Sequence, residues 1–187
     1  KYASIINNQN DRLNAQVEKV LNIAKMEKDQ FKLNLESIEL ESFLNEIVKE
    51  ERIKFEAVDG EITKPHLQEQ IFITADKLHF TNVLSNILDN ALKYRKGTPI
   101  AEIGIIEFQN KVRIIIKDHG IGISKDQIKR IFNKFYRVST GDVHNVKGFG
   151  LGLYYVKSIC DAHEWKIDIQ SELHNGTSVI LEIPKSK

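Results

Sequence analysis

NILDNALKY, at residues 86–94, is the stretch that decides the predicted fold, because it sets polar side chains into an otherwise apolar helical pattern. Asn86, Asn90 and Lys93 are spaced by four and three residues, so they share one face of a helix. Asparagine disfavours helix interiors. Its presence twice favours a ligand-binding face over the alternative, a solvated polar face. Amide oxygens suit a hard cation such as Mg²⁺, and lysine suits phosphate.

The segments on either side of this stretch predict the rest of the fold. Upstream, we expect a strand-like piece at Lys32–Leu35 leading into Glu36–Leu40, a helix over Glu41–Ala57, strands over Glu61–Lys64 and Ile71–Thr74, and a helix that Asp76 caps and that runs to about Tyr94. Downstream, we expect a hairpin of Ala101–Phe108 and Lys111–Lys117, helices over Ser124–Ile131 and Leu151–Ala162, and paired strands Trp165–Ser171 and Thr177–Ile183. This order predicts an α/β (α+β) two-layer sandwich, in which helices cover one face of a mixed, largely antiparallel sheet.

A separate helix is predicted at the N-terminus. Residues 2–28 contain no Gly or Pro, and a heptad seam runs through Ile6, Asn10, Leu13, Val17, Val20 and Ala24. Such a seam favours a long bundle-forming helix over one that packs on its own domain. We therefore divide the chain into residues 1–30 and residues 31–187.

The bulk composition excludes several classes of protein. Of 187 residues, 41% are apolar and the net charge is +1 without a basic stripe, so a packed domain is expected and a nucleic-acid partner is not. No stretch reaches the roughly 20 apolar residues of a membrane span, and no membrane contact is expected. The single cysteine, Cys160, lies in an apolar helical run and is expected in the core. We expect the chain to be part of a longer protein.

Two glycine-rich boxes follow the asparagine helix. Asp118-His-Gly120-Ile-Gly122 comes directly after a predicted strand, and a carboxylate beside glycines suits a planar amino group such as that of adenine. The alternative is an ordinary turn. Gly148-Phe-Gly150-Leu-Gly152-Leu153 precedes a helix, where backbone amides favour an anion. Here the alternative is a flexible hinge.

These three segments, with Phe132-Asn-Lys-Phe135-Tyr-Arg137 between the glycine boxes, resemble in order and spacing the ATPase superfamily of histidine kinases, DNA gyrase and mismatch-repair ATPases. The resemblance to the catalytic domain of sensor histidine kinases covers the chain almost from end to end. It implies ATP and Mg²⁺ as cofactors, with Asn90 at the metal, Asp118 at adenine and Asn86, Asn90 and Lys93 at the reacting phosphates. The residues that it assigns to the nucleotide are Asn86, Asn90, Lys93, Tyr94, Asp118, Gly120, Gly122, Phe135, Lys147, Gly148, Gly150, Leu151, Gly152, Leu153 and Thr177.

The resemblance also implies a reaction. In the gyrase-like relatives a glutamate stands at the position of Asn86 and activates water, whereas an amide cannot act as a general base. We therefore expect slow ATP hydrolysis and transfer of the γ-phosphoryl to a histidine of the dimerisation domain, for relay to a response regulator aspartate. The alternative is an ATP-binding dimerisation or conformational module without kinase activity.

Further expectations concern the whole protein. The N-terminal helix resembles the second helix of the dimerisation domain, which implies a homodimer whose acceptor histidine precedes Lys1. The receiver domain of a response regulator is the expected partner. We expect this part of the protein to be cytoplasmic and the full-length protein to be anchored in the bacterial inner membrane.

Some segments remain open at this stage. His163-Glu164 copies the start of an acceptor box, but a strand entrance follows it, so we reject it as one. The family usually has His-Gly-Gly here, and Glu164-Trp165 departs from that pattern. Residues 138–150 look like a mobile lid. Phe132 and Phe135 suit the core or the base of this lid, and Arg137 suits a phosphate, a partner domain or a surface ion pair.

Overall fold

The structure is a computed structural model that describes residues 31–67, 69–137 and 149–186, with five isolated positions before them. It divides into two compact units, Lys1–Lys32 and Leu33–Lys187. The five isolated positions are all helical: Asn10, Val17, Val20, Leu21 and Ala24. Their helical state agrees with the expected N-terminal helix, and its role in a bundle stays a prediction. Most of the expected lid, residues 138–148, lies outside the described residues.

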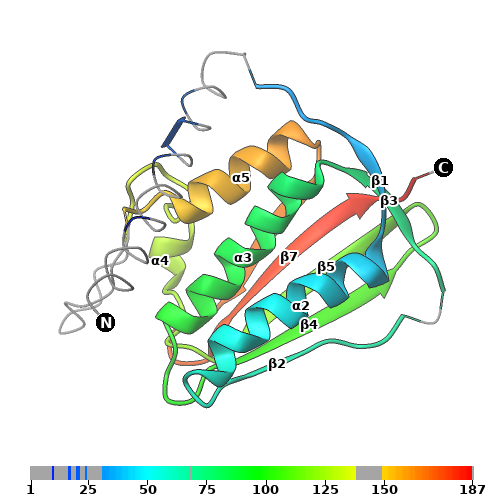
Figure 1. Cartoon of the computed structure of the whole chain (residues 1–187). Coiled ribbons are helices and arrows are strands. Elements are labelled where there is room, and N and C mark those ends of the chain that lie inside the picture. Colours follow the sequence, from blue (N-terminus) through cyan, green and yellow to red (C-terminus); the bar gives the residue numbers. More distant parts are fainter. Residues whose placement is uncertain are drawn as a thin grey trace. The chain divides into compact units, whose positions relative to one another are not determined.

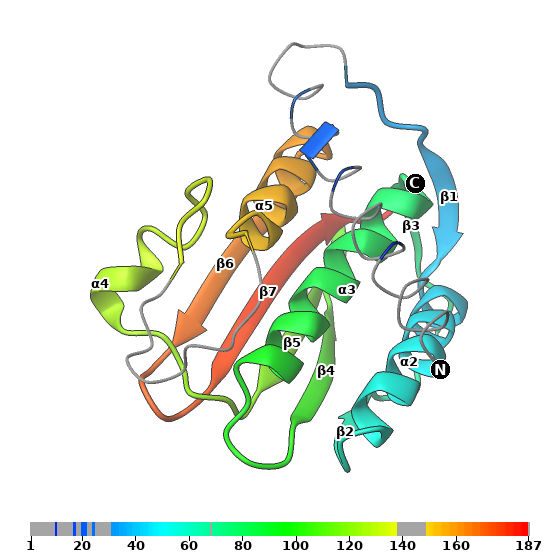
Figure 2. The same ribbon diagram turned by 60° about the vertical axis from the view of Figure 1, so that its left-hand side comes forward.

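The second unit is built around a five-stranded sheet. Its elements are β1 (Glu36–Glu39), α2 (Leu40–Glu56), β2 (Glu61–Thr63), β3 (Phe72–Ala75), α3 (Lys77–Lys93), β4 (Ile100–Glu107), β5 (Lys111–Asp118), α4 (Lys125–Ile128), α5 (Gly152–Ala162), β6 (Lys166–Ser171) and β7 (Thr177–Pro184). The strand order is β2-β4-β5-β7-β6, and only β2 and β4 pair in parallel. Strands β1 and β3 form a separate antiparallel pair. Helices α2, α3 and α5 cover one face of the large sheet (Figures 1 and 2), so the predicted sandwich is confirmed.

Helix α3 is the centre of the core. Its apolar side faces the sheet and its flanks contact α2 and α5. The ring of Phe80, which is fully buried, stacks on Phe43 with centroids 4.6 Å apart and meets the edge of Trp165 at 5.0 Å. Cys160 is fully buried as expected, and burial raises the pKa of its thiol to about 12. A thiol in this state packs as a small apolar group.

Two predicted elements were wrong in their extent. Residues Lys32–Leu35 are not a strand, because pairing with β3 begins only at Glu36 and Leu35 is 54% exposed. The predicted helix over Ser124–Ile131 is limited to α4. The Ser124 hydroxyl donates to the Gln127 side chain and does not cap the helix, and three-residue turns follow α4.

The turn after α5 keeps a glycine-like geometry without glycine. Glu164 has a φ of 59°. The amide of Trp165 donates to the Cys160 carbonyl at 2.8 Å, and that of Glu164 to the Asp161 carbonyl at 3.0 Å. This pair of hydrogen bonds is the Schellman arrangement, in which glycine usually holds the left-handed position. The departure at Glu164-Trp165 therefore leaves the turn intact, and Trp165, only 5% exposed, adds its ring to the core.

His163 is used structurally at both ring nitrogens. Nε2 accepts a hydrogen bond from the Asp76 amide at 3.0 Å, and Nδ1 donates to the Ile159 carbonyl at 2.9 Å. Burial lowers the pKa of the imidazole. Because both ring nitrogens are engaged in hydrogen bonds within the protein, this geometry supports rejecting His163 as an acceptor, and the rejection itself stays a prediction.

Candidate functional site

The C-terminal half of α3, the end of β5 and the start of α5 surround a cavity of about 100 Å³. The side of β7 closes it. Six of the residues that the resemblance assigns to the nucleotide line it: Asn90, Tyr94, Asp118, Gly122, Leu153 and Thr177. Residues that lie far apart in the chain, from three separate motifs, therefore meet at one place.

Asp118 is the polar group at the inner end of this cavity. Its Oδ1 accepts hydrogen bonds from the amides of Gly120 at 2.8 Å and Thr177 at 3.2 Å. Burial raises the pKa of this carboxyl group, and the two amides oppose the rise. No group in the described part of the chain donates to Oδ2. That oxygen can therefore accept a hydrogen bond from an amino group inside the cavity. This availability favours a ligand-binding role for Asp118 over the alternative of an ordinary turn residue.

The glycines of the Asp118 box are required by packing of the protein against itself. A Cβ on Gly120 would lie 2.4 Å from the Tyr94 carbonyl oxygen, and one on Gly122 would lie 1.9 Å from the Glu172 carbonyl oxygen. The Ile121 amide donates to the Tyr94 carbonyl at 2.9 Å. These contacts hold the loop against the end of α3. Close packing within the protein therefore requires glycine at these positions, in addition to the close approach of a ligand expected from the sequence.

The polar face of α3 runs from a buried end to an exposed end. Asn86 is 6% exposed, and its Nδ2 donates to the Asn82 carbonyl at 2.6 Å. Its Oδ1 faces Gly152, where a Cβ would lie 3.3 Å away. Asn86 thus lies against the first turn of α5, Asn90 is half-buried at the cavity, and Lys93 is exposed. An amide in the place of Asn86 has no basic site that could activate water.

The second glycine box lies beside the Phe135 segment. The Gly150 carbonyl accepts from the Phe135 amide at 3.0 Å, and Gly150 has a φ of 70°. Leu151 occupies the N-cap position of α5 without a side-chain hydrogen bond, and Gly152 is the first residue of the helix. Lys147 and Gly148 lie outside the described residues. Phe135 is neither a core nor a cavity residue, because it is 63% exposed and held at a φ of 64°.

Sequence reasoning missed the apolar walls of the cavity, whereas Arg137, which also lines it, had been singled out as a candidate contact. The additional lining residues are Ile87, Ile121, Ile123, Ile131, Tyr136, Arg137, Ile169 and Val179. The alternation of apolar residues in the last two strands marked Ile169 and Val179 as core-facing, but only the fold places them beside Asp118. The structure places Arg137 at the cavity, and the choice among a phosphate, a partner domain and a surface ion pair stays open.

A metal ion would have to be held here by oxygen ligands from amides or from a bound ligand. Across residues 31–67, 69–137 and 149–186, no three or more His, Cys, Asp or Glu side chains form a group that could hold a metal ion. The Asn90 amide fits the oxygen ligands that Mg²⁺ prefers. In the same ranges, no helix is long and apolar enough to cross a membrane.

Comparison with known protein families accounts for this combination of motifs. Residues 75–187 match the model of the histidine kinase-, DNA gyrase B- and HSP90-like ATPases. The chain belongs to this ATPase family. The matched range contains all three motif segments, from the N-cap of α3 to the end of β7, and excludes the N-terminal unit, α2 and β2.

The similar curated proteins are sensor kinases. The sensor protein RprX of Bacteroides fragilis (strain YCH46) is 38% identical over 187 residues, which cover 99% of this chain and 36% of that protein. The sensor protein kinase WalK of Staphylococcus aureus is 31% identical over 186 residues, covering 98% of this chain and 44% of that protein. The chain therefore spans less than half the length of these relatives.

Solved structures agree on the fold. The catalytic domain of histidine kinase ThkA, in a nucleotide-free form, is 25% identical with a TM-score of 0.70, covering 83% of this chain and 100% of that domain. Full-length ShkA, solved in complex with AMPPNP, gives a TM-score of 0.82 at 24% identity, with 100% of this chain and 38% of that protein covered. At this identity the likeness to ShkA supports the fold.

Proposed function

We propose that this chain binds Mg-ATP in the cavity beside Asp118 and supplies the catalytic domain of a sensor histidine kinase. The observation that carries the proposal is the Asp118 carboxylate, which is half-buried in an apolar cavity and has both of its described hydrogen bonds on Oδ1. Adenine offers the matching amino group and an apolar ring. The sensor kinases among the relatives support the choice of reaction.

The other residues take roles that follow from their positions. Asn90 at the cavity holds the metal ion through its amide oxygen, and the exposed Lys93 reaches the phosphates. The amides of Gly150 and Gly152, at the start of α5, favour the same anion. Bound Mg²⁺ would neutralise the phosphates, while these residues position the nucleotide.

The acceptor is a histidine of the dimerisation domain, and the relay continues to a response regulator. Residues 1–30 serve as the second helix of that domain and carry the homodimer contact, and residues 31–187 form the catalytic domain. We place this part of the protein in the cytoplasm and the full-length protein at the bacterial inner membrane. ThkA, one of the structural neighbours, was solved in complex with the response regulator protein TrrA, which supports this choice of partner.

Slow hydrolysis separates this proposal from a gyrase-like conformational ATPase. Asn86 is an amide, is 6% exposed and donates to the Asn82 carbonyl, so it does not serve as the base that steady hydrolysis needs. The phosphoryl group is thereby preserved for transfer.

The test combines titration calorimetry with a turnover assay on the 187-residue chain. We expect ATP and ADP to bind with Mg²⁺, hydrolysis to be barely measurable, and none of the six histidines to become labelled by radioactive ATP. Absence of nucleotide binding would contradict the site. Steady hydrolysis would favour the conformational ATPase, and stable acid-labile phosphate on the chain would contradict the assignment of the acceptor to another segment.

A further inference from the structure

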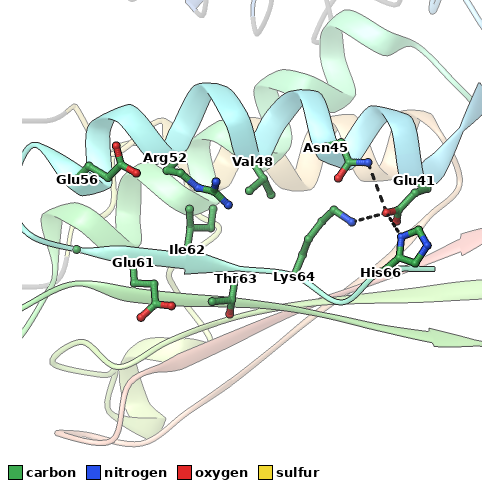
Figure 3. A pocket seen from close by; sticks show the side chains of 11 residues that line it. Glu41, Asn45, Val48, Arg52, Glu56, Glu61, Ile62, Thr63, Lys64 and His66 are labelled. Carbon is green, nitrogen blue, oxygen red and sulfur yellow. Dashed lines mark hydrogen bonds and ion pairs between the residues drawn. The ribbon is translucent and has the colours of Figure 1, made fainter. Parts of the chain in front are cut away.

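A second, larger cavity of about 610 Å³ lies between α2 and β2, at the edge of the sheet (Figure 3). It shares no lining residue with the cavity beside Asp118. Its size lies within the range of about 300–1,000 Å³ that is usual for small-ligand sites. Its lining residues are Glu41, Asn45, Val48, Arg52, Glu56, Gly60, Glu61, Ile62, Thr63, Lys64 and His66.

The backbone of β2 offers free hydrogen-bonding groups along this groove. Among the strands that the structure describes, β2 is an outer strand of the large sheet and pairs only with β4, with Ile62 opposite Ala101. The Glu61 amide donates to the Pro99 carbonyl at 2.9 Å. In a parallel ladder, alternate residues direct both backbone groups to the same side, so Glu61 and Thr63 face β4. The N–H and C=O of Ile62 therefore face the open edge, where another strand can pair with them.

Helix α2 provides the second wall. Val48 and Ile62, which are 5% and 3% exposed, form an apolar floor between the helix and the strand. Figure 3 shows Arg52 extending from α2 toward β2 above Ile62, while Glu61 points to the opposite side of the strand. A peptide strand lying in this groove would contact both the helix and the edge of the sheet.

The charges of the groove are balanced at one end only. Glu41 accepts from Lys64 Nζ at 2.7 Å, from His66 Nδ1 at 2.9 Å and from the Leu67 amide at 3.2 Å. These partners hold the pKa of the Glu41 carboxyl at about 2, even though burial alone would raise it. This end is therefore closed by a neutralised cluster.

Arg52 is different. Its guanidinium makes no hydrogen bond or ion pair within the residues that the structure describes, either with Glu56, one turn further along α2, or with Glu61, which points to the opposite side of β2 (Figure 3). A guanidinium has five donors in a planar fork that fits a carboxylate in a bidentate manner. The complementary occupant is therefore one that brings its own carboxylate to the Arg52 end.

We propose that this groove binds an extended peptide segment of a partner protein, which adds to β2 as a further strand and places an acidic side chain against Arg52. The strand would pair through the N–H and C=O of Ile62 and would cover the apolar floor with one alternate side chain. Because β2 has only three residues, backbone pairing alone supplies few hydrogen bonds. Affinity and specificity would then depend strongly on the Arg52–carboxylate pair.

The probe is the peptide acetyl-Val-Thr-Glu-Thr-Val-amide, in which Val and Glu share one face of a strand; it is titrated into the isotope-labelled 187-residue chain and followed by NMR. We expect chemical-shift changes at Ile62, Lys64 and the Arg52 side chain. Replacing the central Glu of the peptide with Gln should weaken binding about tenfold, because a charge-assisted hydrogen bond is lost. A peptide N-methylated at all five residues, which cannot donate to the edge in either strand direction, should not bind.

Arg52→Gln should weaken binding of the Glu peptide about tenfold and remove the difference between the Glu and Gln peptides. Lys49→Gln, which removes a positive charge from an exposed position of α2 outside the groove, is the matched control and should keep that difference. Absence of binding, shift changes elsewhere, equal affinity of the Glu and Gln peptides, or equal effects of the two variants would each overturn the proposal. Nucleotide titration of Arg52→Gln tests the Asp118 cavity separately.

Discussion

The two ends of helix α3 carry similar polar residues, but these residues differ in how many of their hydrogen bonds are made within the protein. At the N-terminal end, every polar group of a buried cluster has a protein partner. At the C-terminal end, polar groups around the cavity are only partly used by the protein. The comparison shows that residue type and burial do not by themselves mark a functional site; what marks it is burial combined with incomplete hydrogen bonding.

At the N-terminal end of α3, which we call the closed end because its polar groups are paired within the protein, Asp76 links three segments. Its Oδ1 caps α3 through the His79 amide at 3.0 Å, and its Oδ2 accepts from the Asn34 amide at 2.8 Å. His79 Nδ1 lies 2.7 Å from the Tyr155 hydroxyl of α5. Burial lowers the pKa of His79 and raises that of Tyr155 to about 12. Both shifts favour the neutral forms of His79 and Tyr155, and the hydrogen bonds of this cluster stabilise the fold.

At the C-terminal end of α3, which we call the open end, the Asp118 carboxylate accepts hydrogen bonds from two backbone amides on one oxygen. Asn90 remains half-buried beside the cavity. Such groups add less to stability than groups that are fully paired. Changes at the closed end should therefore alter stability, and changes at the open end should alter binding.

The largest effect is expected from Asp76→Ala. It removes the N-cap of α3 and leaves the amides of His79 and Asn34 without their acceptor, which costs roughly 2–4 kcal/mol of unfolding free energy. Urea denaturation measures this. Asp89→Ala is the control, because Asp89 makes only a surface ion pair with Lys54 at 3.4 Å and should cost less than about 1 kcal/mol. Equal losses in the two variants would contradict the comparison.

Asp118→Asn comes next and acts on binding. Loss of a charge-assisted hydrogen bond should weaken nucleotide affinity tenfold or more, or about 1.5–3 kcal/mol, as measured by calorimetry. Since the folded-state pKa of Asp118 is raised, ionisation opposes folding as pH rises above the carboxyl's ordinary value. The variant should therefore be at least as stable as the wild type at neutral pH. Unchanged affinity would make Asp118 a turn residue.

A smaller effect of opposite sign is expected from Glu164→Gly, at the C-terminus of α5. The left-handed conformation costs a side-chain-bearing residue roughly 1–2 kcal/mol, part of which is offset by the greater chain entropy of glycine. Unfolding free energy should rise by about 0.5–1 kcal/mol, as measured in urea. Glu69→Gly, at an exposed loop position with no such φ, should give no gain. A loss of stability in Glu164→Gly would mean that its side chain contributes more than its backbone costs.

The smallest effect is a pH dependence of the closed end. The pKa values of His79 and His163 are lowered in the folded state by burial, so the unfolded chain binds protons first. Stability is then fully present above the ordinary histidine value of about 6.5 and declines as pH falls below it. Unfolding measured across this range should show the decline, and His163→Asn should reduce it, whereas His174→Asn, at an exposed turn, should not. A flat profile would contradict the lowered values.

Local signals were enough to place the residues of α3 and β5. Asp76 and Tyr94 bound α3 as predicted, because the cap and the apolar period are properties of adjacent residues. Asp118 ends β5 for the same reason. Turns that depend on distant partners were harder. The strand expected at Lys32–Leu35 begins four residues later, because its start is set by where β3 lies.

The cavities could not be predicted from the sequence. Ile131 and Ile169 look like ordinary core residues until the fold places them beside Asp118. Arg52 lies on a helix with many charged residues, and nothing in its sequence neighbours shows that it lacks an ionic partner. The glycines of the Asp118 box were recognised, but their close approach to Tyr94 and Glu172 depends on how three loops meet.

The packing of Trp165 has a spectroscopic consequence. It is the one tryptophan of the chain, and its indole lies between Phe80 and the His163 ring at the closed end. None of the residues that line the cavity beside Asp118 is in this group. Tryptophan fluorescence should therefore report the folding of the closed end of α3. It should not change when a ligand binds in the cavity beside Asp118. The chain thus carries its own optical probe, with which unfolding can be followed while nucleotide is titrated at the other end of the same helix.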